Sequence, residues 1–358
     1  MGKRITWMDA LKGFCILLVI YCHNVILPNK TIIGNLMIAL ATAGVPCFMM
    51  VSGALLHNTP SFSWQKYFQR LGKIYVSLVM WRIIYLLISC ICFKPHFSKI
   101  QLFKYLFLFG SIEKVPSEVM WYMIALLLVL LIYPLSYFLF HEENPHGKMF
   151  IFLLILSFLG GFLVPVGNYF AELLCRFFDI PIIDLFGIYN ILPFSQHSNL
   201  LFFFLLGAFL SKNDSIIKEK IYSRRYWKLI PYLLVIIGII GLTVMKFTMS
   251  GTFYWQGIGI ESGYNRLSAI ILSIGMWLTF SMHNGKIIQF LSKYVGKYTM
   301  GVYYIHFIIL AICTHYLYPY INNYIIGMNS IKTIIIAIIS ILITRIMLHI
   351  PIIKEIFK

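Results

Sequence analysis

Long apolar segments recur along the whole chain, and they constrain its fold more than any other feature. The segment Ile151–Leu163, for example, contains no charged residue and does not alternate between polar and apolar positions. A helix needs about 20 mostly apolar residues to cross a bilayer, whereas a transmembrane β-strand alternates lipid-facing with lumen-facing residues. The pattern therefore predicts an all-α, polytopic membrane bundle and excludes a β-barrel.

Ten segments are long enough, with their flanks, to be transmembrane helices. We place them at Gly13–Leu27 (extended back to Ile5), Ile33–Leu56, Ile74–Phe93, Val119–Phe140, Met149–Val166, Ile191–Leu210, Trp227–Met245, Leu267–Met282, Met300–Tyr318 and Ile331–Ile353. A shorter segment, Ile100–Phe109, is predicted to lie at the membrane interface. No linker or change in composition divides the chain, so residues 1–358 are expected to form a single transmembrane domain.

The composition agrees with this class. Of the 358 residues, 60% are hydrophobic and only 11% are charged, whereas a soluble domain carries roughly 25% charged residues. An ordinary soluble enzyme, a disordered chain and a disulfide-rich secreted scaffold are therefore excluded. The seven cysteines lie mostly inside apolar segments and fit no zinc-site spacing, so we expect no metal and no disulfide.

The formal net charge of +17 would suggest a nucleic-acid partner in a soluble protein. In a membrane protein, basic residues concentrate in cytoplasmic loops instead. With the N-terminus placed in the cytoplasm, the inside segments hold 18 lysines and arginines and the outside segments hold nine. We therefore expect a multi-pass protein of the cell (inner or plasma) membrane, with both termini cytoplasmic and no nucleic-acid partner.

The first predicted helix carries three ionisable residues on one face. At 100° per residue, Lys12 and His23 are only 20° out of register after three turns, and Asp9 falls on the same side. With a rise of 1.5 Å per residue, His23 lies roughly 16 Å deeper than Lys12. Ionisable groups inside a span are costly and indicate function. The alternative is structural, with Lys12 extending to the interface and His23 in an interior hydrogen bond.

Five motifs in order give the chain a family resemblance. They are Arg4, Trp7, Asp9, Lys12–Gly13 and His23; the aromatic-containing run Val45–Gly53; the basic cluster Lys66, Arg70 and Lys73; Trp121–Tyr122; and Gly296–His306. Together they resemble the acyltransferase family 3 membrane proteins, over the whole length of the chain. The family's ten-helix core agrees with the ten segments. Two departures are Lys12, where Arg is commoner, and Val76–Ser77, where the family has a proline.

The resemblance implies transfer of an acyl group, usually acetyl from cytoplasmic acetyl-CoA, to a hydroxyl of a carbohydrate or lipid-linked glycan. Such a reaction needs a base for the hydroxyl proton, and a neutral imidazole can serve near pH 7. His23 is the candidate, either as this base or as a covalent carrier of the acyl group. Asp9 and Lys12 would orient its helix or contact the donor.

A CoA donor brings phosphates and requires cations on the cytoplasmic side. Arg70, Lys73 and Lys66 are predicted there, and Arg70 and Lys73 are neighbours on a helix surface. Arginine suits forked phosphate contacts and lysine suits point-charge contacts. The alternative is that these residues only mark the cytoplasmic side.

Four further residues are candidates for the acceptor site. Arg82 lies mid-span and needs a partner or a water-filled cavity, which makes it a substrate contact or part of a structural ion pair. Glu118, beside Trp121, is placed to orient a glycan hydroxyl. His306 is functional on the resemblance and otherwise forms a helix–helix hydrogen bond.

Two functions of other classes also suit a polytopic chain. A glycolipid or polysaccharide transporter (or flippase) would have intramembrane charges, but we find no pair of broken helices in two halves. A polytopic glycosyltransferase or polymerase would require a large outside loop rich in carboxylates, and the longest outside loops here carry few.

Overall fold

The computed structural model describes residues 5–24, 32–107, 110–141, 146–180, 198–248, 263–316 and 328–350, and all regular structure in these ranges is helical. The α-helices are α1 (Thr6–Asn24), α2 (Ile32–Ala41), α3 (Gly44–His57), α4 (Trp64–Cys92), α5 (Lys99–Phe107), α6 (Trp121–His141), α7 (His146–Phe177), α9 (Ser198–Lys212), α10 (Asp214–Ser223), α11 (Ile230–Thr248), α12 (Leu267–Ser281), α13 (Lys286–Tyr294), α14 (Thr299–Tyr316) and α15 (Met328–Met347). Short 3₁₀ turns η1 (Glu118–Met120), η2 (Arg225–Leu229) and η4 (Gly296–Tyr298) lead into α6, α11 and α14.

Helices of the described residues overlap every one of the ten predicted spans. Seven helices or helix pairs are long and apolar enough to cross a membrane, and the pair α9–α10, bent by 66°, is an eighth candidate. Two shorter apolar helices, Gly147–Leu163 and Leu267–Ser281, cover the remaining two spans. The predicted all-α polytopic bundle is confirmed, while the count of ten stays a prediction. Most of the predicted interfacial segment, Ile100–Phe109, forms the short helix α5, and its position at the membrane interface stays a prediction.

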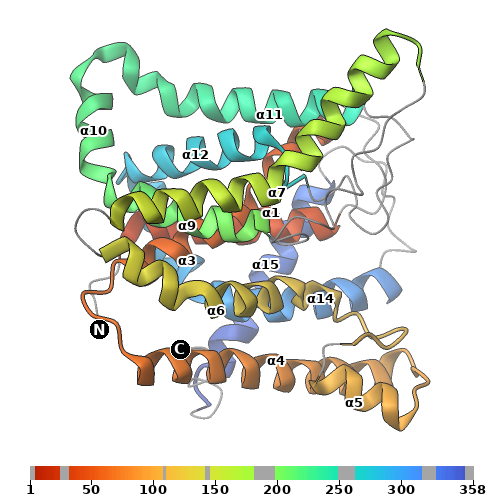
Figure 1. Ribbon diagram of the computed structural model, residues 1–358. Helices are drawn as coiled ribbons and strands as arrows, with labels where there is room; N and C mark the ends of the chain where they lie inside the picture. The colour runs from red at the N-terminus through yellow and green to blue at the C-terminus, as the bar shows by residue number, and fades with distance from the viewer. Residues whose placement is uncertain are drawn as a thin grey trace.

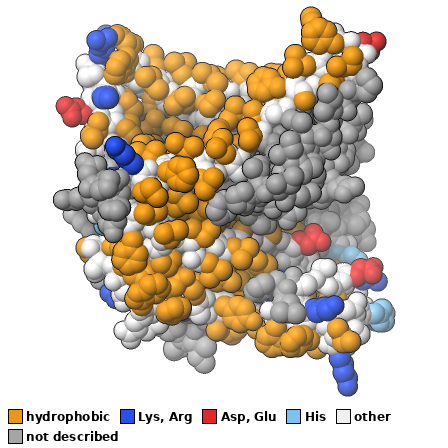
Figure 2. Space-filling view, viewed as in Figure 1, with side chains coloured by type: hydrophobic (Ala, Val, Ile, Leu, Met, Phe, Trp, Pro, Cys, Tyr) orange, Lys and Arg blue, Asp and Glu red, His pale blue; other side chains and the backbone are white. Residues whose placement is uncertain are grey.

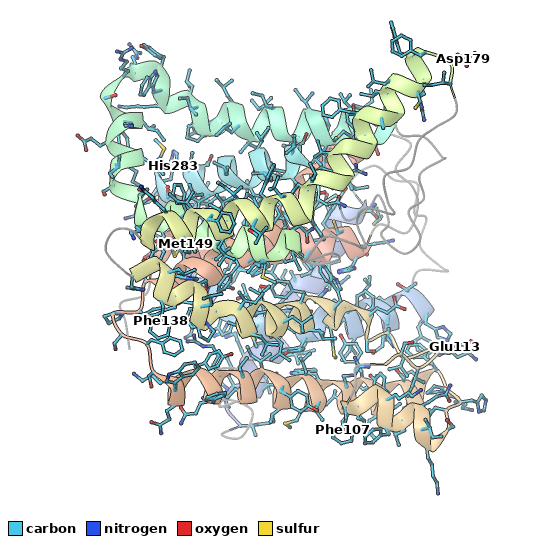
Figure 3. All side chains as sticks on the ribbon, in the orientation of Figure 1. Phe107, Glu113, Phe138, Met149, Asp179 and His283 are labelled. Atoms are coloured by element: carbon cyan, nitrogen blue, oxygen red, sulfur yellow. The ribbon has the colours of Figure 1, made fainter. Side chains whose placement is uncertain are left out.

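Most of the helices lie roughly alongside one another, so the bundle has two ends (Figure 1). Figure 3 shows Phe138, Met149 and His283 toward one end and Glu113 and Asp179 toward the other. We call the first the Thr6 end and the second the Glu113 end. Helix α13 begins three residues after His283, and Thr6 on α1 lines a pocket with residues of α13, so Thr6 belongs to the same end as His283. Arg345 on α15 lines the same pocket. The first and last described helices therefore have their outer termini at the same end.

Helix α1 runs through the interior of the bundle. Its buried residues include Ala10, Leu11, Cys15, Ile16 and Ile20, and it contacts α2, α3, α12, α13, α14 and α15. Near its far end, the Asn24 side-chain amide donates to the carbonyl of Asn329 at 3.1 Å. Because α1 is surrounded by other helices, its ionisable residues Asp9, Lys12 and His23 are buried or partly buried within protein.

Glycines allow the closest helix contacts. A Cβ at Gly53 on α3 would overlap the Phe204 carbonyl of α9, and a Cβ at Gly207 on α9 would overlap the Met50 carbonyl of α3. In a bilayer, helix association depends on such close backbone approach because lipid is as apolar as the helix surfaces. The Ser52–Gly53 pair of the second sequence motif is therefore a packing element.

The outer surface of the bundle is apolar. Figure 2 shows hydrophobic side chains over most of the described part of one face, with charged side chains gathered toward its edges. On α11, exposed residues such as Leu233, Ile236, Ile237 and Ile240 follow helical spacing. This surface is what a protein embedded in lipid requires.

Candidate active site

Two histidines from opposite ends of the sequence meet inside the bundle. The ring of His23 on α1 lies 5.7 Å from the ring of His306 on α14, centroid to centroid, with an angle of 36° between the planes. His306 is fully buried and His23 is partly buried. Phe307 packs edge-on against His23 at 5.1 Å. The structure thus brings together the predicted catalytic histidine and the predicted substrate histidine.

The hydrogen bonds of His306 determine which of its nitrogens can act. Its Nδ1 lies 3.0 Å from the Val302 carbonyl oxygen, and because a carbonyl only accepts, Nδ1 must carry the proton. The neutral ring therefore has its lone pair on Nε2. Nε2 is buried and has no hydrogen-bond partner among the described residues. Buried polar atoms without a partner are rare in folded proteins, so this nitrogen is available for a substrate hydroxyl or a water.

An aromatic and hydroxyl network fixes the helix that carries His306. Ser77 on α4 donates to the Tyr304 hydroxyl at 3.1 Å, and the Tyr85 hydroxyl donates to the Tyr304 carbonyl at 2.9 Å. Trp81 stacks on the Tyr304 ring at 5.0 Å. On the other side, the Tyr303 hydroxyl donates to the Val119 carbonyl of η1. These bonds hold α14 against α4 and α6, which keeps His306 at its position beside His23.

Asp9 and Lys12 form an ion pair near the start of α1. Lys12 Nζ lies 2.7 Å from Asp9 Oδ1, three residues apart on the helix, and Asp9 is buried. His23 follows Lys12 by three turns, roughly 16 Å along the axis. The three predicted catalytic residues therefore occupy one helix at two levels, and the ion pair does not contact the His23 ring. Arg4, the first residue of the same motif, lies outside the described residues.

The glycines of two motifs explain the packing around this ion pair. A Cβ at Gly296 in η4 would overlap the carbonyl oxygen of Asp9, and a Cβ at Gly13 would lie 2.9 Å from the Gly296 nitrogen. Only glycine at both positions lets the backbone of η4 approach α1 so closely. The Lys12–Gly13 and Gly296–Tyr298 segments are therefore neighbours in space.

The three predicted donor-binding cations lie near the start of α4. Lys66, Arg70 and Lys73 are all exposed, and the Lys66 backbone nitrogen is capped by the Ser63 hydroxyl. Contacts of Ser77 with Tyr304 and of Cys92 with Tyr316 show that α4 and α14 run in the same direction. Ser77 and Tyr304 are in contact, and Arg70 and Lys297 each precede their contact residue by seven positions. Arg70 and Lys297 therefore lie at a similar level, near the Thr6 end.

Arg82 holds a short helix in place. Its guanidinium donates to the carbonyls of Tyr105 and Gly110 and lies 4.0 Å over the Tyr105 ring. The Tyr105 hydroxyl donates back to the Arg82 carbonyl at 3.1 Å. Arg82 therefore attaches α5 and Gly110 to α4. The sequence predicts that a mid-span arginine needs a partner, and the structure supplies two backbone carbonyls and an aromatic ring. A substrate contact for Arg82 stays a prediction.

Glu118 and Trp121 lie at the Glu113 end. Glu118 is exposed in η1, and Trp121 stacks on Tyr264 at 5.9 Å. Val119 lies between them in the sequence, and its carbonyl accepts the hydrogen bond from the Tyr303 hydroxyl. Tyr303 precedes His306 by three residues on α14. The two predicted acceptor residues are thus tied through η1 to the helix that carries His306.

Three cations near Asp9 are not assigned to the site by the sequence: Lys293 and Lys297 count there only among the inside basic residues, and Arg345 is not singled out. Lys293, Lys297 and Arg345 line a pocket together with Asp9. The sequence signal that could have identified the two lysines is their spacing of four residues, on either side of Gly296.

His57 is another buried histidine, but both of its nitrogens have partners, Gly53 O and Ser136 Oγ. Within the described ranges, no group of three His, Cys, Asp or Glu residues gathers as a metal site would require.

The chain matches a family model described as an acyltransferase domain over residues 5–349, nearly its whole length. No curated protein matches the chain significantly.

Proposed function

The chain belongs to the acyltransferase family 3 membrane proteins, and from this premise we propose that it transfers an acetyl group from cytoplasmic acetyl-CoA to a sugar hydroxyl of a cell-surface polysaccharide or of its lipid-linked precursor. The observation that carries the proposal is the pairing of His23 with His306, where a buried Nε2 that has no hydrogen-bond partner among the described residues adjoins a second imidazole. The family match favours this function over a transporter, which needs no base.

In the proposed reaction, an imidazole nitrogen of His23 accepts the proton of the acceptor hydroxyl. The oxygen forms a bond to the thioester carbonyl carbon, and the bond from that carbon to sulfur breaks. The protonated imidazole then returns its proton to the departing thiolate, which leaves as CoA. His306 Nε2 accepts a second hydrogen bond from the acceptor and orients it. A base of this kind typically contributes 10²–10⁴-fold to the rate.

The positions along α1 support a donor that enters from the Thr6 end. The cations of α4 and the Asp9–Lys12 pair lie near that end, and His23 is roughly 16 Å farther along the helix than Lys12. The shape of acetyl-CoA matches this separation between the cations and His23, because a long, thin pantetheine arm separates its phosphates from its thioester. The acceptor would approach from the Glu113 end, past Glu118 and Trp121.

The test uses surface glycans from cells with and without the gene. Mass spectrometry should detect a loss of about 42 Da, one acetyl group, per modified sugar when the gene is deleted. Purified protein in nanodiscs should then transfer radiolabelled acetyl from acetyl-CoA to the deacetylated glycan. Unchanged glycan masses together with altered glycolipid distribution across the membrane would instead favour the transporter.

A further inference from the structure

A pocket of about 280 Å³ opens at the Thr6 end, between the start of α1, the end of α13 and the end of α15. Its lining comes from four separate elements and comprises Thr6, Asp9, Ser292, Lys293, Tyr294, Lys297, Tyr298 and Arg345. Its volume is close to the lower end of the range for small-molecule sites. None of the residues predicted to bind the donor, on α4, lines it.

The charge around this pocket is strongly positive. Lys293, Lys297 and Arg345 are exposed, and none of the three forms a salt bridge with a carboxylate of the described residues. The carboxylate in the lining, Asp9, lies 2.7 Å from Lys12 Nζ, so its charge is already balanced. Cations that only mark one side of a membrane can be scattered over that side. Here, cations from α13, η4 and α15 surround one concave site.

The segments that line the pocket are closely packed beside Asp9, and two of the lining residues are aromatic. Gly296 packs directly against the Asp9 backbone, which fixes η4 on α1. Tyr294 and Tyr298 line the pocket beside the lysines, with Lys293 Nζ 5.0 Å from the Tyr294 ring centroid and Lys297 Nζ 5.6 Å from that of Tyr298. A site with several cations and aromatic faces suits a ligand that is both phosphorylated and aromatic.

We propose that this pocket binds the phosphorylated nucleotide part of the acyl donor, with Lys293, Lys297 and Arg345 contacting its phosphates. This inference rests on the proposed function, because it identifies where the CoA-type donor is held. Arginine offers a forked pair of donors to phosphate oxygens and lysine a point charge, and a purine ring can stack on Tyr294 or Tyr298. The pocket adjoins Asp9, so the pantetheine arm would begin at the level of the Asp9–Lys12 pair.

Binding of the nucleotide can be measured without any acyl transfer. The probes are CoA and adenosine 3′,5′-bisphosphate, which lacks the pantetheine arm, titrated into detergent-purified full-length protein at low and high salt. The double variant Lys293→Gln/Lys297→Gln should weaken binding of both probes by about tenfold or more, since each lost charge-assisted hydrogen bond contributes that much. The loss should be larger at low salt, because salt screens exposed charges.

Lys286→Gln is the matched control, because Lys286 lies on the same helix α13 but outside the pocket lining. It should bind both probes as the unmodified protein does. Arg345→Gln tests the pocket independently from α15, and thermal unfolding of each variant shows whether the fold is intact. Arg70→Gln/Lys73→Gln measures the rival donor site on α4.

The possible results separate the two proposals. If CoA binds and only the α4 variant weakens it, the pocket assignment is wrong and the proposed function stands. If neither probe binds the unmodified protein, both the CoA donor and the pocket assignment fail. If the bisphosphate does not bind but native mass spectrometry finds phosphatidylglycerol retained in a Lys293- and Lys297-dependent manner, the pocket is a lipid headgroup site and the proposal is overturned.

Discussion

His23 and His306 lie with their ring centroids 5.7 Å apart, on α1 and on α14, which are separated by most of the chain. The contact places a buried nitrogen without a described partner next to the histidine that the sequence singles out for catalysis. Both histidines lie on helices held by close contacts with their neighbours.

The first prediction concerns His23 itself. His23→Ala should insert and fold normally but acetylate its acceptor at least about a hundredfold more slowly, because loss of a general base costs 10²–10⁴-fold. Loss of a single intramembrane hydrogen bond costs only about 0.6 kcal/mol and would leave the rate nearly unchanged. The rate is measured with purified protein in nanodiscs. His315→Ala is the control, because His315 is exposed on α14 and packs against Phe93. Normal acetylation by well-folded His23→Ala would make His23 a packing residue.

The second prediction concerns the coupling of the two histidines. His306→Phe keeps an aromatic ring but removes Nε2, and we expect kcat to fall about tenfold or more. If the two rings act on one acceptor, the double variant His23→Ala/His306→Phe should be scarcely slower than His23→Ala alone, since residues that act as a unit are not additive. A double-mutant cycle on kcat measures this coupling. Fully additive losses would show that the histidines act independently.

The third prediction concerns the α3–α9 contact. Gly53→Ala should lower the thermal unfolding temperature, because the added Cβ would overlap the Phe204 carbonyl and force the two helices apart. Overpacking of this kind typically costs about 1–3 kcal/mol. Gly72→Ala on α4 is the control, because a Cβ there would meet no atom within 4 Å. Equal stability of the two variants would contradict the close packing of α3 on α9.

The fourth prediction concerns Arg82 and α5. Arg82→Lys keeps the charge but loses the planar group that donates to two carbonyls while stacking on Tyr105. Hydrogen exchange of the α5 amides should become faster by a clear margin, while exchange in α12 stays the same. Unchanged exchange in α5 together with a raised KM for the acceptor would assign Arg82 to substrate binding instead.

The fifth prediction concerns orientation. The start of α1 and the end of α15 lie at one end of the bundle, and the excess of basic residues in the predicted inside loops predicts that this end is cytoplasmic. Reporter fusions after Lys358 and near Arg225 should therefore both report a cytoplasmic location. A periplasmic or extracellular signal at either position would show that the predicted topology is wrong.

The sequence alone determined the class of the fold and the position of most helices. Hydropathy is a local property of the chain, so the ten apolar segments could be located without knowing their neighbours, and each overlaps a helix of the described residues. The placement of Asp9, Lys12 and His23 at two levels of one helix also follows from the sequence, because helical geometry fixes the angle and the rise. The ion pair between Asp9 and Lys12 is local in the same sense.

Contacts between distant helices were decided only by the tertiary structure. Nothing in the residues around His306 indicates that it faces His23, and the carbonyl partners of Arg82 carry no signal in the sequence at all, because every residue has a carbonyl. The cationic pocket likewise depends on tertiary packing, because Gly13 and Gly296 let η4 approach α1, which brings Lys297 to Asp9, and the end of α15 adds Arg345. In lipid, apolar surfaces do not select their partners by hydrophobicity, so such pairings depend on close packing and on hydrogen bonds between helices.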